Sequence, residues 1–220
     1  MSDTDQFIFG YGSFIESRTR SMTSPSALYA FPVNVVGIQR GWFGQVGGVS
    51  LSPTYLGAVS DSNSNCNGVI FKVSQQELEA FDNYETDYKR ERVDQENIIM
   101  LDGRKFPPEG DIWFYTVTEK RFASLEFPIV QSYVDVCLNG CLEIEAAYPL
   151  AKEAEFTVTF LKTSTNWSKY WVNDRIYPRR ASIYLPNAGN IDELIRKVLG
   201  EEIFSNIKIE PANWERNDER

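Results

Sequence analysis

The sequence predicts a globular α+β protein in which a curved mixed sheet or a small β-barrel is flanked by helices. Strand patterns dominate the middle of the chain, helical patterns dominate its second half, and no internal repeat or low-complexity segment is visible. The 220 residues include 42% hydrophobic and 14% aromatic residues. A chain of this length and composition can bury a full hydrophobic core.

The first predicted element is an apolar strand that breaks into a glycine-containing turn, in the stretch Phe7-Ile8-Phe9-Gly10-Tyr11-Gly12-Ser13-Phe14. Glycine permits unusual turn conformations and leaves the backbone N–H groups uncovered. Successive N–H groups in a turn form a concave nest for a carboxylate or phosphate, and Ser13 adds a hydroxyl donor. Most turns of this kind serve only the chain reversal, so the turn alone does not define a site.

Nucleotides are not the expected ligand of this turn. Residues 10–15 lack the third glycine of the G-x-G-x-x-G dinucleotide motif, and G-x-x-x-x-G-K-[ST] occurs nowhere in the chain. The net charge of −9 and the pI near 4.7 also argue against nucleic acid as a partner, because phosphate binding needs clustered Lys and Arg.

Three strands are predicted after a polar loop at residues 22–30. They lie at residues 34–42, 55–59 and 68–73, and the last two are expected to pair as a hairpin around a turn at 61–65. The Gly- and Ser-rich residues 46–53 are expected to connect elements near the mouth of any pocket.

The next element is a short helix with a capping box, Ser74-Gln75-Gln76-Glu77, at its start. Leu78 and Phe81 are expected on its inner side. Asp82 is then near its C-terminal end, where a hydrogen-bond acceptor is a better interpretation than a catalytic acid. Glu85 follows on the next turn.

The second half of the chain contributes two further strands and two helices. The strands are expected at residues 88–93 and 111–117, the latter in the core. One helix is expected to begin with Pro128 in its first turn and to carry Ile129, Tyr133, Val136, Cys137 and Cys141 at helical spacing; the other spans 191–199 and ends at Gly200.

The chain has no histidine and only three cysteines, Cys66, Cys137 and Cys141. Ser-His-Asp and Cys-His mechanisms are therefore excluded, and acid–base chemistry must use Asp, Glu, Lys, Tyr or a thiol. The cysteines are expected to be reduced, buried and apolar in role, and neither a metal site nor a cofactor is expected. No signal peptide or membrane span is evident, so a cytoplasmic protein is predicted.

Several of these patterns together resemble the gamma-glutamylcyclotransferase-like family (the AIG2-like or BtrG-like group). The resemblance covers about residues 7–145. It rests first on Tyr11-Gly12-Ser13, on Tyr55-Leu56 with the strand at 68–73, and on the spacing of Leu78, Phe81, Asp82, Glu85, Tyr88 and Arg90. The run Trp113-Phe114-Tyr115 and the stretch 132–140 add to it. It implies this family's fold for residues 1–149, with residues 150–220 as a C-terminal extension packed on the same domain.

The resemblance also implies a reaction and a site. A γ-glutamyl amide would be cleaved by attack of its own α-amine, giving 5-oxoproline and a free amine. Glu85 matches the general acid/base, and Tyr11, Gly12, Ser13 and Phe14 match the loop whose amides hold the α-carboxylate. Tyr115 and Tyr133 match tyrosines that line the site. Phe14 departs from the smaller residue that relatives often carry.

Alternatives remain open from the sequence alone. Glu85 on a solvated turn would pair with Lys89, and Tyr115 and Tyr133 would serve equally as core aromatics. The protein would then be a non-catalytic binding or interaction protein for a small carboxylate. The aromatic and arginine-rich residues 167–180 are open to three interpretations: a cover that sets specificity, a homodimer contact, or additional core.

Overall fold

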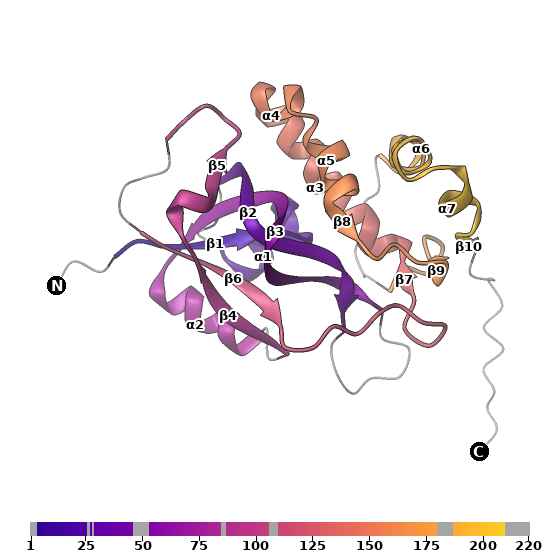
Figure 1. The fold of residues 1–220 in the computed structure, drawn as a ribbon, viewed down its shortest axis with the longest axis horizontal. Helices are drawn as coiled ribbons and strands as arrows, with labels where there is room; N and C mark the ends of the chain where they lie inside the picture. Colours follow the sequence, from indigo (N-terminus) through magenta and orange to yellow (C-terminus); the bar gives the residue numbers. More distant parts are fainter. Residues whose placement is uncertain are drawn as a thin grey trace, which may run out of the picture.

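The structure is a computed structural model that describes residues 4–25, 27, 29–45, 53–84, 87–105, 110–179 and 187–209. A seven-stranded mixed sheet forms the left part of the molecule in Figure 1, with helix α2 beside it. Helices α3, α4 and α5 lie along its right flank, and α6 and α7 lie outermost. The sheet is curved and not closed into a barrel, so the curved-sheet form of the predicted α+β fold is confirmed.

The main sheet has the strand order β4-β6-β1-β3-β2-β5, and β8 pairs with β2 outside this path. The β1–β6 and β2–β8 pairs are parallel, and the others are antiparallel. Its strands are β1 (Gln6–Gly10), β2 (Ala30–Gly44), β3 (Tyr55–Val73), β4 (Tyr88–Val93), β5 (Ile98–Met100), β6 (Asp111–Val117) and β8 (Ser164–Thr165). A second sheet, in the order β10-β9-β7, contains β7 (Ile129–Val130), β9 (Trp171–Asn173) and β10 (Lys208–Ile209).

The α-helices are α1 (Ser17–Thr23), α2 (Gln75–Tyr84), α3 (Gln131–Ala147), α4 (Pro149–Glu153), α5 (Phe156–Thr163), α6 (Ala188–Leu199) and α7 (Glu201–Ser205). Two 3-10 turns, η1 (Ser13–Ile15) and η2 (Gln95–Asn97), complete the set.

The predicted hairpin between residues 55–59 and 68–73 is wrong, because both segments belong to the single strand β3 and both pair with β2. The register passes from Val36 opposite Asn65 to Ile38 opposite Ser60, so residues 61–64 form a wide bulge. Asp61 accepts hydrogen bonds from the Asn63 amide at 3.1 Å and the Ser64 hydroxyl at 2.5 Å. The turn-forming residues therefore make a local turn, but inside a continuous strand.

Two helix starts also differ from the prediction. Helix α1 occupies residues 17–23, where a polar loop was expected from residue 22, because the Glu16 carboxylate caps it by accepting from the Thr19 amide at 2.6 Å. Helix α3 begins at Gln131. Ile129, which was expected in this helix, lies in strand β7 and pairs with Trp171 of β9. Pro128 thus precedes a strand and not a helix.

The capping box is confirmed atom by atom. Glu77 Oε2 accepts from the Ser74 amide at 2.8 Å, and the Ser74 hydroxyl accepts from the Glu77 amide at 3.2 Å. Leu78 and Phe81 are buried on the inner side of α2, as predicted. The predicted strands at 88–93 and 111–117 are β4 and β6, and α6 ends before Gly200, which adopts a φ of 93°.

The three cysteines are buried and none of them forms a disulfide, as predicted. Burial raises the pKa of the Cys66 thiol to about 11 and raises that of Cys141 well above its usual value. These thiols therefore stay protonated at neutral pH and pack as small apolar groups.

Helix α3 approaches the loop after β1 at Gly140, so a methyl group added at this position is expected to destabilise the protein. A Cβ at this position would lie 2.4 Å from the Glu16 amide nitrogen and 2.7 Å from its Cα. We expect Gly140→Ala to reduce the free energy of unfolding by about 1–3 kcal/mol, despite the higher helix propensity of alanine. Urea denaturation measures this.

Gly189→Ala is the matched control, because Gly189 lies in α6 and a Cβ there meets no atom within 4 Å. It should leave the free energy of unfolding unchanged or raise it by up to about 1 kcal/mol. Equal effects of the two substitutions would contradict the close packing of α3 on Glu16.

Candidate functional site

The loop between β1 and α1 has every carbonyl from residue 11 to residue 15 engaged within the protein. Gly12 O and Ser13 O accept from the amides of Ile15 and Glu16 at 3.0 and 3.1 Å. The other three carbonyls accept from two arginines: Arg40 Nη1 bonds Tyr11 O at 3.2 Å, and Arg20 Nη1 bonds Phe14 O at 2.9 Å and Ile15 O at 3.0 Å.

The backbone amides of the same loop, unlike its carbonyls, are not engaged by other described residues at positions 12–14. No hydrogen bond from the N–H of Gly12, Ser13 or Phe14 reaches another residue within the described ranges. Backbone donors that are not paired internally are available to an external acceptor, and consecutive donors suit an anion. The loop therefore has the polarity of an anion-binding nest.

Tyr133, in the first turn of α3, places its hydroxyl over this nest. A Cβ on Gly12 would lie 3.0 Å from Tyr133 Oη and 3.7 Å from Leu56 Cβ, so a larger residue here would press on the Tyr133 hydroxyl. The Tyr133 ring is 6% exposed and packs edge-on against Trp42 and Tyr55, at centroid distances of 5.9 and 5.0 Å. These rings fix the direction of the hydroxyl.

A chain of hydrogen bonds joins the loop to the C-terminal part of α2. Tyr11 Oη donates to the Tyr115 carbonyl at 2.6 Å, and Tyr115 Oη donates to Asp82 Oδ1 at 2.9 Å. Asp82 Oδ2 lies 2.9 Å from Arg90 Nη1 on β4. Asp82 therefore serves as an acceptor, as predicted, and ties α2 to β6.

The family is established by a comparison of the sequence. Residues 8–131 match the family model described as "Gamma-glutamyl cyclotransferase, AIG2-like". The chain belongs to this family. No curated protein matches the sequence.

Several solved structures are similar to this chain. A structure titled "Gamma-glutamyl cyclotransferase" superposes with a TM-score of 0.52 at 15% identity, covering 88% of this chain and 99% of that one. The human protein loc79017 gives a TM-score of 0.52 at 15% identity, with 87% and 98% covered. A yeast gamma-glutamyl cyclotransferase specific to glutathione gives a TM-score of 0.43 at 10% identity, with 72% and 97% covered.

In this cyclotransferase-family chain, the structure brings the predicted site residues together in two pairs, Tyr11 with Tyr115 and Gly12 with Tyr133. Tyr11 contacts Tyr115 through its hydroxyl, and Gly12 lies against Tyr133. Ser13 begins η1 beside them. Phe14 differs, because its ring packs into the core against Phe81 and Phe71, at centroid distances of 5.2 and 6.3 Å.

Two parts of the predicted site lie outside the described residues. One is Glu85, so its role stays a prediction; Asp82 is three residues before it in the chain. The other is the predicted connection at 46–53, of which residues 46–52 are not described.

Sequence analysis missed Arg20 and Arg40, which hold the loop. Arg40 is fully buried and Arg20 is 4% exposed. Burial lowers the pKa of both guanidinium groups, although arginine keeps its charge in proteins. The available signal was an arginine within the predicted strand at residues 34–42, in the same alternation phase as the apolar Ile38 and Trp42, because such a charge must find buried acceptors.

The aromatic part of residues 167–180 packs as additional core. Trp167 lies 5.0 Å from the Trp42 ring and stacks on Trp171 at 5.0 Å. Trp171 is 1% exposed, whereas Tyr177 is 58% exposed. For the two tryptophans, the core interpretation is therefore confirmed.

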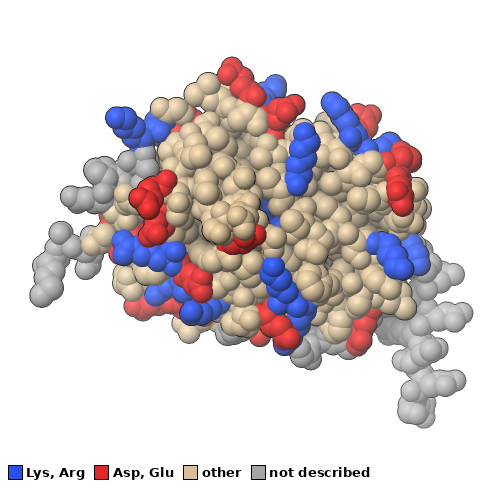
Figure 2. Space-filling model, viewed as in Figure 1, with Lys and Arg blue, Asp and Glu red and all other residues tan. Residues whose placement is uncertain are grey.

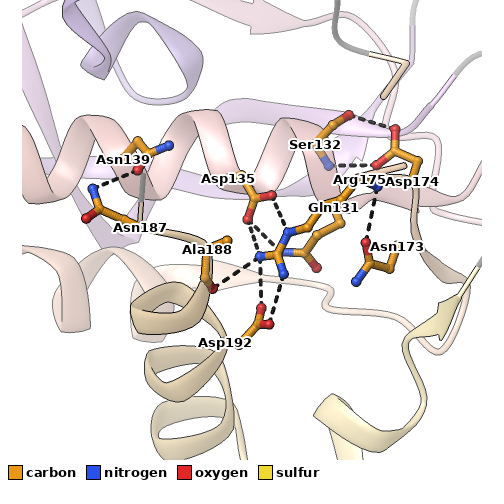
Figure 3. Close-up of polar contacts among 10 residues, drawn as sticks. All are labelled: Gln131, Ser132, Asp135, Asn139, Asn173, Asp174, Arg175, Asn187, Ala188 and Asp192. Atoms are coloured by element: carbon orange, nitrogen blue, oxygen red, sulfur yellow. Dashed lines mark hydrogen bonds and ion pairs between the residues drawn. The ribbon is translucent and has the colours of Figure 1, made fainter. Parts of the chain in front are cut away.

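Polar contacts fasten the segment after β9 to the start of α3, close to Tyr133 (Figure 3). Asp174 Oδ1 accepts from the Ser132 amide and Oδ2 from the Ser132 hydroxyl, both at 2.7 Å. Arg175 lies between Asp135 and Asp192, with N–O distances of 2.8 Å to each. Burial raises the pKa of the Asp135 carboxyl, and Arg175 opposes this rise.

Charged side chains of both signs are interspersed on the face shown in Figure 2, with uncharged surface between them. Within the described part of the chain, no cluster of three or more Cys, Asp and Glu side chains is arranged to hold a metal ion. None of the described helices is both long and apolar enough to span a membrane.

Removal of the Asp174 carboxylate should destabilise the protein strongly. Asp174→Ala leaves the Ser132 amide and hydroxyl without their acceptor in a buried place, so we expect a loss of about 2–4 kcal/mol in the free energy of unfolding. The control is Glu119→Ala, which removes an exposed ion pair with Arg121 and should change stability by less than about 1 kcal/mol. Chemical denaturation curves with the same midpoint for both variants would refute the fastening role of Asp174.

Proposed function

We propose that the protein is a γ-glutamyl cyclotransferase, which converts a γ-glutamyl amide into 5-oxoproline and a free amine or amino acid. Family membership supports the reaction class. The observation that carries the proposal for this chain is the loop at residues 11–15, whose carbonyls are all engaged while the amides of Gly12, Ser13 and Phe14 are not bonded to other described residues. Such a loop suits the α-carboxylate of a γ-glutamyl group.

In the proposed reaction, the substrate's α-amine nitrogen attacks its own γ-carbonyl carbon, and the bond from this carbon to the leaving amine breaks. An α-ammonium group cannot attack, so a base must first remove a proton. The same group can then give the proton to the leaving amine. Atoms and charge balance without an external nucleophile, oxidant or reductant.

We assign the base and acid to Glu85. Position 85 follows Asp82 by three residues, a span of about 11 Å at most, and Asp82 bonds the Tyr115 hydroxyl beside Tyr11. The proposed role requires a carboxyl group whose pKa is raised towards neutrality, as loss of solvation does.

The loop and the tyrosines have complementary roles in this proposal. Tyr133 Oη, which lies next to Gly12, is a candidate donor to the oxyanion that develops on the γ-carbonyl. The hydrogen bonds of Tyr11 and Tyr115 fix the position of the loop relative to α2. The amine half of the substrate is not specified by these contacts, so glutathione, a γ-glutamyl amino acid and a γ-glutamylated amine are all candidates.

The experiment is to incubate the protein with a panel of these γ-glutamyl compounds and to measure 5-oxoproline. Glu85→Gln should reduce kcat by about 10²–10⁴-fold, the usual contribution of general acid–base catalysis. Glu79→Gln is the matched control, because Glu79 is exposed on α2 and, among the described residues, its carboxylate hydrogen-bonds Gln75 alone. It should retain wild-type activity.

Two outcomes would reject the proposal. Equal activity of Glu85→Gln and wild type would remove Glu85 from the mechanism. Binding of γ-glutamyl compounds by wild type without any 5-oxoproline would instead favour a non-catalytic protein for small carboxylates.

A further inference from the structure

Arg40 on β2 is a buried guanidinium group whose three nitrogens all donate hydrogen bonds. Nη1 bonds the Tyr11 carbonyl at 3.2 Å and the Asn67 carbonyl at 2.6 Å. Nε bonds Ser164 Oγ at 2.9 Å. Nη2 bonds Asn67 Oδ1, the Phe160 carbonyl and Thr163 Oγ1, at 3.1, 2.9 and 2.8 Å. Arg40 therefore joins the site loop to strand β3 and to residues 160–164.

Residues 160–164 lie well beyond the family match, which ends at residue 131. They form the end of α5 and the start of β8, which pairs with β2 so that Ser164 lies opposite Arg40. The guanidinium carbon also lies 3.9 Å from the centroid of the Phe160 ring. The C-terminal segment thus supplies three acceptors and one aromatic face to a residue that touches the loop.

The bond to Tyr11 acts on the Gly12 amide through their shared peptide group. No peptide bond in the described chain is cis, and in a trans peptide the C=O and N–H groups point in opposite directions. A cation on the Tyr11 oxygen therefore polarises the Gly12 N–H and fixes it pointing away from Arg40. A polarised, oriented donor binds an anion more strongly.

The charge of Arg40 adds to this effect. Among the described residues Arg40 has no ion pair with a carboxylate. Its positive charge is therefore stabilised by neutral hydrogen-bond acceptors and is screened little by solvent. An anion at the nearby loop gains from this field.

We propose that Arg40 is a positioning residue for recognition of the substrate's α-carboxylate, and that residues 160–164 hold it in place. This rests on the proposed function for the identity of the ligand. It makes a segment outside the matched family region part of the machinery that sets carboxylate affinity.

The test compares two ligands that differ only in the carboxylate: 5-oxoproline, and 2-pyrrolidone, which lacks it. Dissociation constants are measured by NMR titration for wild type, Arg40→Lys and the double variant Thr163→Val/Ser164→Ala. We expect 5-oxoproline to bind about tenfold more weakly to both variants, a difference of about 1.4 kcal/mol. The affinity for 2-pyrrolidone should stay within about twofold of wild type.

The control is Thr159→Val, because Thr159 is one turn before Thr163 on α5 and its hydroxyl bonds only Ala154 O. It should leave both dissociation constants unchanged. If Arg40→Lys fails to fold, as judged by its thermal transition, the double variant decides, since it keeps the arginine and removes two acceptors.

An equal loss for both ligands, or no loss for 5-oxoproline, overturns the proposal, because a merely structural role does not depend on the carboxylate. Failure of wild type to bind 5-oxoproline overturns it as well. If wild type binds 5-oxoproline but forms none from γ-glutamyl compounds, the proposed reaction fails while the positioning role is still decided by the titration.

Discussion

The contact between the Arg40 guanidinium and the Tyr11 carbonyl connects the main parts of this protein. Arg40 is buried in the middle of β2, and its partners come from the site loop, from β3 and from the α5–β8 segment. A buried charge is tolerated only when its donors are satisfied, so the positions of these segments are interdependent. The loop is consequently held from one side by the sheet and from the other by Arg20.

The properties of the loop follow from this arrangement. Two arginines and the η1 turn engage its carbonyls, whereas its amides at residues 12–14 bond no other described residue. Other elements come close to two glycines: the Tyr133 hydroxyl lies near Gly12, and Glu16 lies so near Gly140 on α3 that a Cβ there would clash with its backbone. Asp174 then fastens the start of α3, which carries Tyr133, to the C-terminal segment. The site loop and the packing of the second half of the chain are in this way physically linked.

Local features of the sequence predicted local structure well. The Ser74–Glu77 capping box and the apolar run at 111–117 require only neighbouring residues, and both are confirmed. The hairpin around residues 61–65 was wrong because turn residues do not specify which strand their flanks pair with, and β2 is long enough to pair with both.

The roles of the site residues stay predictions. Sequence reasoning selected the turn after β1 from its glycines, and the family pattern added Tyr115 and Tyr133. In the structure Tyr11 contacts Tyr115, and Gly12 lies against Tyr133. Arg40 was missed because its partners at residues 160–164 are more than a hundred residues away in the chain. The role of Glu85 and the division of the chain at residue 149 stay predictions.

The most direct measurement of the central claim is a crystal structure of the protein with 5-oxoproline bound. The account predicts that the carboxylate oxygens lie about 2.7–3.2 Å from the amide nitrogens of the loop at residues 12–14, with the lactam ring between them and the Glu85 carboxyl group. A carboxylate bound elsewhere, with these amides turned toward other protein atoms, would contradict it.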